Sequence, residues 1–157
     1  MKQEVLFFER QYMMTWVLVV VLLGGLGIPL IMAFVKGVPP IVTFMTLIFI
    51  VILLLFASMQ TKVTREKLLV SFGLLPLIKF SYRIDDVRAF AVRSYQPVGE
   101  YGGWGIKGSK QNRALNMRGT EGVQLELLDK QGSMWKLLIG SQMPEKLASA
   151  IRIAKAQ

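Results

Sequence analysis

The stretch on which the fold prediction depends reads Val63-Thr64-Arg65-Glu66-Lys67-Leu68-Leu69-Val70-Ser71-Phe72 and continues as Gly73-Leu74-Leu75-Pro76. Charged residues gather at Arg65–Lys67 between two apolar segments, a pattern that predicts a turn joining two strands. Gly73 and Pro76 predict a second turn, and 77–82 begins a third strand. The sequence therefore predicts an antiparallel β-domain from residue 60 onward.

The same kind of pattern continues toward the C-terminus. Alternating residues predict strands over 87–95, 122–128 and 133–139, the last two joined by a turn at Asp129–Gly132. Pro144 then fits the first turn of a helix, and apolar residues at helical spacing form one stripe: Leu147, Ala150, Ile151 and Ala154. Several antiparallel strands followed by one amphipathic helix favour a curved sheet or a split barrel with the helix packed on an open end.

The N-terminal third is more apolar than the rest of the chain. Hydrophobic residues make up 53% of the 157 residues, and the stretches 13–35 and 41–59 contain no charged side chain. Runs of this length predict a transmembrane helical hairpin, with spans at about 13–35 and 40–59. Residues 1–12 are then expected to be a separate, amphipathic cytoplasmic segment at the membrane surface, and 60–157 a cytoplasmic domain.

Four residues are expected at the membrane interface. Trp16 lies near the start of the first expected span, where an indole favours the headgroup level, and Lys62, Arg65 and Lys67 follow the second. Since the loop between the spans carries only Lys36, the positive-inside rule predicts a multi-pass protein with both termini in the cytoplasm.

One segment combines aromatic residues, glycines, a proline and charges of both signs, and we call residues 95–118 the candidate interaction loop. Its candidate site residues are Tyr95, Pro97, Glu100, Tyr101, Gly102, Gly103, Trp104, Gly105, Lys107, Arg113, Asn116 and Arg118. Trp104 has two interpretations, a structural plug that fills the barrel or covers its own loop, and an exposed anchor for a partner or the membrane interface. Glu100 is expected to pair with Arg113 or Arg118, or alternatively to face a cationic partner.

The composition argues against catalysis. The chain has no histidine and no cysteine, so neither a histidine-based triad nor a thiolate metal site is available. Gly103-x-Gly105-x-x-Gly108 formally matches a dinucleotide fingerprint, but the polar and basic residues after it show no apolar helical stripe. No catalytic residue, metal or cofactor is predicted.

The net charge of +9 instead indicates which kinds of partner the chain is expected to bind. A basic run within the candidate interaction loop is either a solvated face or a contact for anionic lipid phosphates: Lys107, Lys110, Arg113 and Arg118. Membrane lipids and a protein partner or a second copy of the chain are therefore the expected partners. Nucleic acid is not expected, because no recognised binding motif accompanies the charge.

Three segments resemble the bacterial pleckstrin-homology-like (bPH) membrane proteins: 63–70, the turn Gly73–Pro76, and 82–87. Residues 100–106, 116–123 and 138–145 look like an uncharacterised subgroup of that family with a two-helix anchor. The resemblance implies a seven-stranded PH-like barrel capped by the C-terminal helix, in the bacterial cytoplasmic (inner) membrane.

Together these patterns predict an α+β membrane protein, a transmembrane helical hairpin followed by a PH-like antiparallel split β-barrel capped by a C-terminal helix. The expected function is non-enzymatic: a membrane-anchored module for protein interaction or self-assembly at the inner membrane. Two alternatives stay open, an anionic-lipid sensor and a small accessory subunit of a membrane transport or enzyme complex.

Overall fold

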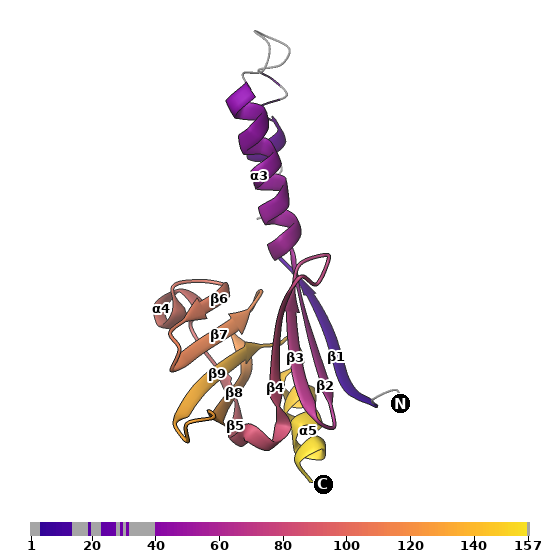
Figure 1. Cartoon of the computed structure of the whole chain (residues 1–157), viewed down its shortest axis with the longest axis vertical. Coiled ribbons are helices and arrows are strands. Elements are labelled where there is room, and N and C mark those ends of the chain that lie inside the picture. Colours follow the sequence, from indigo (N-terminus) through magenta and orange to yellow (C-terminus); the bar gives the residue numbers. More distant parts are fainter. Residues whose placement is uncertain are drawn as a thin grey trace.

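Two β-sheets make up most of the molecule (Figure 1). The computed structural model describes residues 4–13, 19, 23–27, 29, 31 and 40–156. The first sheet has the strand order β1-β2-β3-β4, and each neighbouring pair is antiparallel. Its strands are β1 (Val5–Tyr12), β2 (Ser58–Thr64), β3 (Lys67–Phe72) and β4 (Ile78–Arg83).

The second sheet has the order β5-β8-β9-β7-β6, and its β7–β9 pair is parallel. Its strands are β5 (Val87–Ser94), β6 (Gly105–Gly108), β7 (Asn112–Asn116), β8 (Glu121–Leu128) and β9 (Met134–Gly140). A single 3-10 turn, η2 (Ile84–Asp86), joins β4 of the first sheet to β5 of the second. The predicted turns at Arg65–Lys67, Gly73–Pro76 and Asp129–Gly132 are confirmed.

The core lies between the sheets and is closed at one end by α5 (Pro144–Lys155). Strands β2, β3, β8 and β9 contribute fully buried apolar side chains, among them Phe72 and Leu137. The predicted apolar stripe of the C-terminal helix is confirmed, because all four of its members are buried against this core. Lys155 in the last turn donates from Nζ to the backbone oxygen of Val87, which ties the helix to the start of β5.

The N-terminal segment belongs to the first sheet. Residues 5–12, expected at a membrane surface, instead pair with β2 along their length. The side chains on the inner face of β1 include Glu9, which is 5% exposed. Its carboxylate accepts hydrogen bonds from Ser141 Oγ at 2.6 Å and from the backbone N of Gln142 at 2.8 Å. A strand at the start of the chain thus holds the connection between β9 and α5, 132 residues away.

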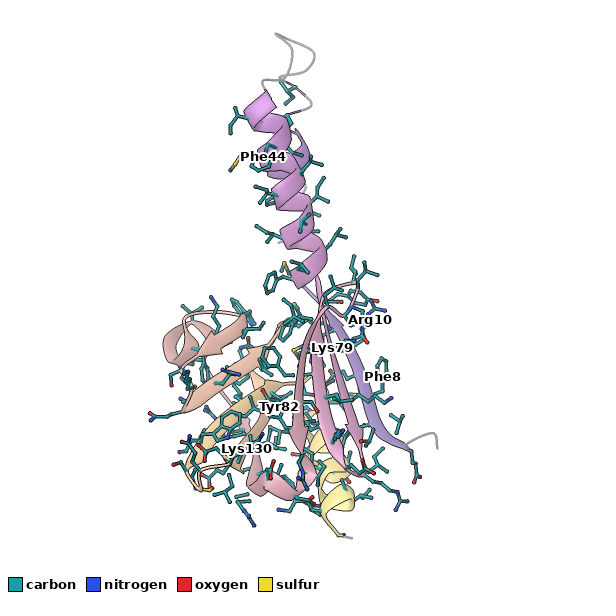
Figure 2. All side chains as sticks on the ribbon, in the orientation of Figure 1. Phe8, Arg10, Phe44, Lys79, Tyr82 and Lys130 are labelled. Atoms are coloured by element: carbon teal, nitrogen blue, oxygen red, sulfur yellow. The ribbon has the colours of Figure 1, made fainter. Side chains whose placement is uncertain are left out.

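Helical structure precedes β2. The described part includes a π-helical turn, η1 (Leu23–Gly27), and α3 (Pro40–Phe56), which projects beyond both sheets (Figure 1). Gly25 lies against the ring of Phe49 on α3, where a larger side chain would overlap it. Apolar side chains of α3 such as Phe44 are exposed (Figure 2).

The predicted membrane anchor is contradicted. Among the described residues, none of the helices combines the length and the apolar character needed to cross a bilayer. The second expected span (40–59) is interrupted because α3 ends at Phe56 and Ser58–Thr64 hydrogen-bonds between β1 and β3. Most of the first expected span (13–35) lies outside the described residues. The predicted fold class, an α+β membrane protein with a transmembrane hairpin, is therefore corrected to a mainly β structure of two sheets. The same finding contradicts the expected multi-pass inner-membrane localisation with both termini cytoplasmic.

The buried carboxylate of Glu9 gives the first testable prediction. Glu9→Ala should lower the free energy of unfolding by about 2–4 kcal/mol, because it leaves the buried hydroxyl of Ser141 and the partly buried backbone N–H of Gln142 without this acceptor. Urea denaturation of the whole chain measures this. Glu4→Ala is the matched control: Glu4 pairs with Arg65 on the surface, and its loss should cost less than about 1 kcal/mol. Equal effects of the two substitutions would contradict a structural role for Glu9.

Candidate functional site

The candidate interaction loop is a folded extension of the second sheet, with a small core of its own. Tyr95 and Tyr101 are both buried, and their rings meet edge to face at 6.1 Å between centroids. They pack with Ala114 of β7 and Leu138 of β9. These two aromatic residues are therefore part of the structural core of the loop.

A short helix, α4 (Pro97–Tyr101), begins the loop. Pro97 occupies its first turn, where no backbone donor is needed. Gly102 ends it with φ +75°, a left-handed conformation that favours glycine, and Gly103 continues with φ +126°. The glycines that follow Tyr101 thus reverse the chain so that it can enter β6.

Charged and polar side chains fix α4 against β5. Arg93 Nη2 donates to Glu100 Oε2 at 2.8 Å and to the hydroxyl of Tyr101 at 3.0 Å. Glu100 Oε1 also accepts from the backbone N of Gln96 at 2.8 Å. The expected partner of Glu100 was Arg113 or Arg118, and this is wrong: the cation comes from the neighbouring strand β5. The ion pair therefore links the loop to β5 and is not the pair within the loop that was expected.

These contacts shift the pKa values of both partners. The hydrogen bond from Arg93, followed by that from the Gln96 backbone, lowers the pKa of Glu100 below its ordinary value of 4.5. The same hydrogen bond to Glu100 raises the pKa of Arg93. Both side chains are about one third exposed, so solvent screens the pair and its contribution to stability is small.

The second half of the loop is the hairpin β6–β7, which sequence patterning did not predict. The backbone N of Gly105 donates to Asn116 Oδ1 at 2.8 Å, which fixes the start of β6 against the end of β7. Gly108 has φ +85°, and a Cβ there would overlap the backbone oxygen of Asn112. The Gly-x-Gly-x-x-Gly spacing therefore serves a hairpin, and a strand stands where a dinucleotide fingerprint requires a helix.

Trp104 lies at the edge of this hairpin and lines an open, mainly apolar pocket of about 480 Å³, the Trp104 pocket. Trp104 is 36% exposed, so it is not a buried plug, and its Nε1 donates to the backbone oxygen of Gly119 at 3.2 Å. The pocket is also lined by Met13, Phe56, Gly105, Ile106, Lys107 and Met117. Among the described residues of its lining, Lys107 is the only charged one.

The basic run of the loop does not gather in one place. Lys107 lines the Trp104 pocket, whereas Lys110 and Arg113 line a different groove beside Tyr82. The guanidinium of Arg113 lies 5.6 Å from the ring centroid of Phe80. Arg118 is exposed in the turn between β7 and β8. A single cationic face is therefore not formed by these four residues.

The residues expected at a membrane interface are also separated from α3. Lys62 lies within β2, which runs away from the end of α3, and Arg65 and Lys67 lie at the far end of that strand (Figure 1). Arg65 there donates to Glu4 at 2.7 Å. Trp16 lies outside the described residues.

Several residues that build the site escaped sequence reasoning. Met13 and Phe56 were assigned to expected membrane spans, and nothing in their sequence context placed them beside Trp104. Ile106 and Met117 had a weak signal, an apolar residue on each side of a polar segment, which is the pattern of a hairpin. Arg93 could have been found, because strand alternation over 87–95 places a cation close to the loop.

Neither a protein family model nor a curated protein sequence matches this chain. Within the described residues, no group of three or more potential acidic, histidine or cysteine ligands could hold a metal ion. The site is thus defined by its geometry: a loop with its own small core, one partly exposed indole and an apolar pocket at the junction of α3, β1 and β6.

The ion pair of Glu100 gives a prediction with a definite sign. Because the pKa of Glu100 is lowered in the folded chain, its contribution to stability is present above about pH 4.5 and is lost as the pH falls through the lowered pKa. The amide signal of Gln96 in nuclear magnetic resonance spectra reports the protonation of Glu100 directly, and its titration midpoint should lie below 4.5.

Two variants of the same strand sharpen this test. Arg93→Gln should raise the midpoint toward the ordinary value, because it removes the main cause of the shift. Arg88→Gln, an exposed arginine of β5 outside the network, should leave the midpoint unchanged. A midpoint that is the same in all three proteins would contradict the assigned pairing.

Proposed function

We propose that this chain is a non-catalytic interaction module that binds a partner protein or a second copy of itself through the Trp104 pocket. The partly exposed indole of Trp104 at the wall of this pocket is the observation that carries the proposal. Tryptophan is enriched among residues that dominate interface energetics, especially where it lines an apolar pocket. The absence of histidine and cysteine from the sequence supports a non-catalytic role.

The packing of the loop supports the same proposal. Two buried tyrosines and the hydrogen bond from Trp104 to Gly119 anchor the binding surface, and the Arg93–Glu100 pair adds a weaker contact. A pre-organised surface loses less conformational entropy on association than a mobile loop would. The pocket volume of about 480 Å³ suits one or a few apolar side chains of a partner.

A protein ligand is favoured over an anionic lipid surface at this site. Only Lys107 of the basic run lines the pocket, and the remaining members lie elsewhere. Electrostatic attraction to anionic lipids grows with each basic residue close to the surface, so a scattered run gives little of it. The resemblance to the bacterial pleckstrin-homology-like proteins stays a proposal beside this one; the two packed sheets and the C-terminal helix support it.

The test is site-specific photo-crosslinking in cells that express the full chain. A photoreactive residue in place of Lys107, inside the pocket, should form an adduct with a protein, either a second copy or another chain. The matched control replaces Val98, an exposed apolar residue of α4 that does not line the pocket. Mass spectrometry identifies the adduct.

Trp104→Ala should then weaken adduct formation from position 107 by about 30-fold or more, the loss expected for a central interface tryptophan. Urea denaturation checks that this variant remains folded. Equal adducts from positions 107 and 98, an adduct with lipid alone, or an adduct unchanged by Trp104→Ala would each contradict the proposal.

A further inference from the structure

The first sheet ends at β1, and the outer side of this strand has no neighbouring strand in the described part of the chain. Figure 1 shows β1 at the side of the molecule opposite α4 and β6, so this edge is separate from the candidate interaction loop. The strand is eight residues long and therefore presents a long row of backbone groups at the edge of the sheet.

The backbone groups that face outward belong to alternate residues of β1. Met13 N donates to the backbone oxygen of Ala57 at 3.0 Å, which identifies a hydrogen-bonded pair at the end of the antiparallel ladder with β2. Such pairs alternate along a ladder, so every second residue back from Met13 also bonds to β2. The N–H and C=O groups of Phe8, Arg10 and Tyr12 therefore point away from β2, where a further strand could pair with them.

Two exposed aromatic residues flank a cation along this edge. Phe8 and Tyr12 are 55% and 48% exposed, and the guanidinium of Arg10 lies 5.2 Å from the ring centroid of Tyr12. Figure 2 labels Phe8 and Arg10 on this side of the molecule. Alternate side chains share one face of a strand, so these three lie on the outer face of the sheet, whereas the buried Glu9 lies on the inner face.

The outer face beside this edge is basic. Lys62 of β2 lies directly opposite Phe8, and Lys79 of β4 lies in the same cross-strand row as Arg10. None of these three cations belongs to an ion pair within the part of the chain that the structure describes. The two rows that contain them include no acidic residue: Arg10, Gln60, Ser71 and Lys79 in one, and Phe8, Lys62, Leu69 and Ser81 in the other.

We infer that β1 is a docking edge for an extended segment of another, acidic protein, which adds to the first sheet as a fifth strand. Main-chain hydrogen bonds to Phe8, Arg10 and Tyr12 supply affinity, and the alternating side chains of the added strand supply specificity. The best cross-strand pairs place an acidic residue opposite Arg10 and apolar residues opposite the two aromatic rings. A second copy of the chain is disfavoured as the occupant, because each copy carries a net charge of +9.

The probe is the acetylated and amidated peptide Thr-Val-Thr-Glu-Thr-Val-Thr, which presents this pattern in either strand direction. Nuclear magnetic resonance of the full chain measures peptide binding and the hydrogen exchange of the β1 amides. Exchange at Phe8, Arg10 and Tyr12 should slow when the peptide binds, because these amides gain acceptors. N-methylation of the two valines and the glutamate should weaken binding by about ten-fold or more, since it removes donors that face β1. N-methylation of the two threonines beside the glutamate is the matched control and should have little effect.

A charge exchange tests the assigned pair. Arg10→Glu should weaken binding by about three- to ten-fold, and the peptide with lysine in place of glutamate should restore it, which also shows that the variant is folded. Lys79→Glu makes the same change in net charge three strands from β1. That separation is about 14 Å, beyond the screening length of about 8 Å, so binding should change little.

Three outcomes would overturn the inference. The first is unchanged exchange at Phe8, Arg10 and Tyr12 in the presence of the peptide. The second is an equal loss of binding in Arg10→Glu and Lys79→Glu, which would show a diffuse charge effect. The third is a different occupant of the edge, shown by self-association that Arg10→Glu disrupts, or by a single-stranded oligothymidylate that binds this face while the peptide does not.

Discussion

The buried carboxylate of Glu9 connects parts of the chain that are otherwise far apart. It lies on β1, at the outer edge of the first sheet, and accepts hydrogen bonds from Ser141 and Gln142, where β9 of the second sheet turns into α5. Gln11, two residues along the same face, donates to the backbone oxygen of Gly140 at 2.9 Å. Because buried polar groups are costly when unpaired, these bonds favour one arrangement of the two sheets.

The candidate site depends on that arrangement. The end of β1 places Met13 at the Trp104 pocket, and the start of β2 follows directly from α3, which places Phe56 there. The opposite wall comes from Trp104, which directly precedes β6 of the second sheet, and from Ile106 within β6. A change in how the sheets are joined would therefore change the shape of the pocket without touching its lining residues.

Local patterns were enough to predict much of the β-domain and its last helix. The alternation in 122–128 and the turn at Asp129–Gly132 together predict a β-hairpin, and the apolar stripe of the C-terminal helix predicts which of its faces is buried. Prediction from local patterns failed where a segment is apolar because of its packing against distant parts of the chain. Residues 5–12 were expected to be a surface segment because their partner, Ser58–Thr64, lies far along the chain, and its first two residues were counted within the expected membrane span 40–59.

The site was predictable in part. The crowding of aromatic residues and glycines correctly marked an unusual backbone at Gly102, but it did not show that Tyr101 is buried or that Glu100 pairs with Arg93. Those facts depend on which strand lies beside the loop. The pocket was not predictable, since Met13 and Trp104 are far apart in the sequence and line the same pocket only in the folded arrangement of the two sheets.

Native-state hydrogen exchange of the full chain tests most directly whether β1 is part of one cooperative unit. Amides of β1 that hydrogen-bond to β2 should open with about the same free energy as amides in β8 and β9, and Glu9→Ala should lower both values together. If β1 exchanged rapidly as a frayed terminal segment while β8 and β9 stayed protected, the two sheets would not be joined in the way described, and the account would be wrong.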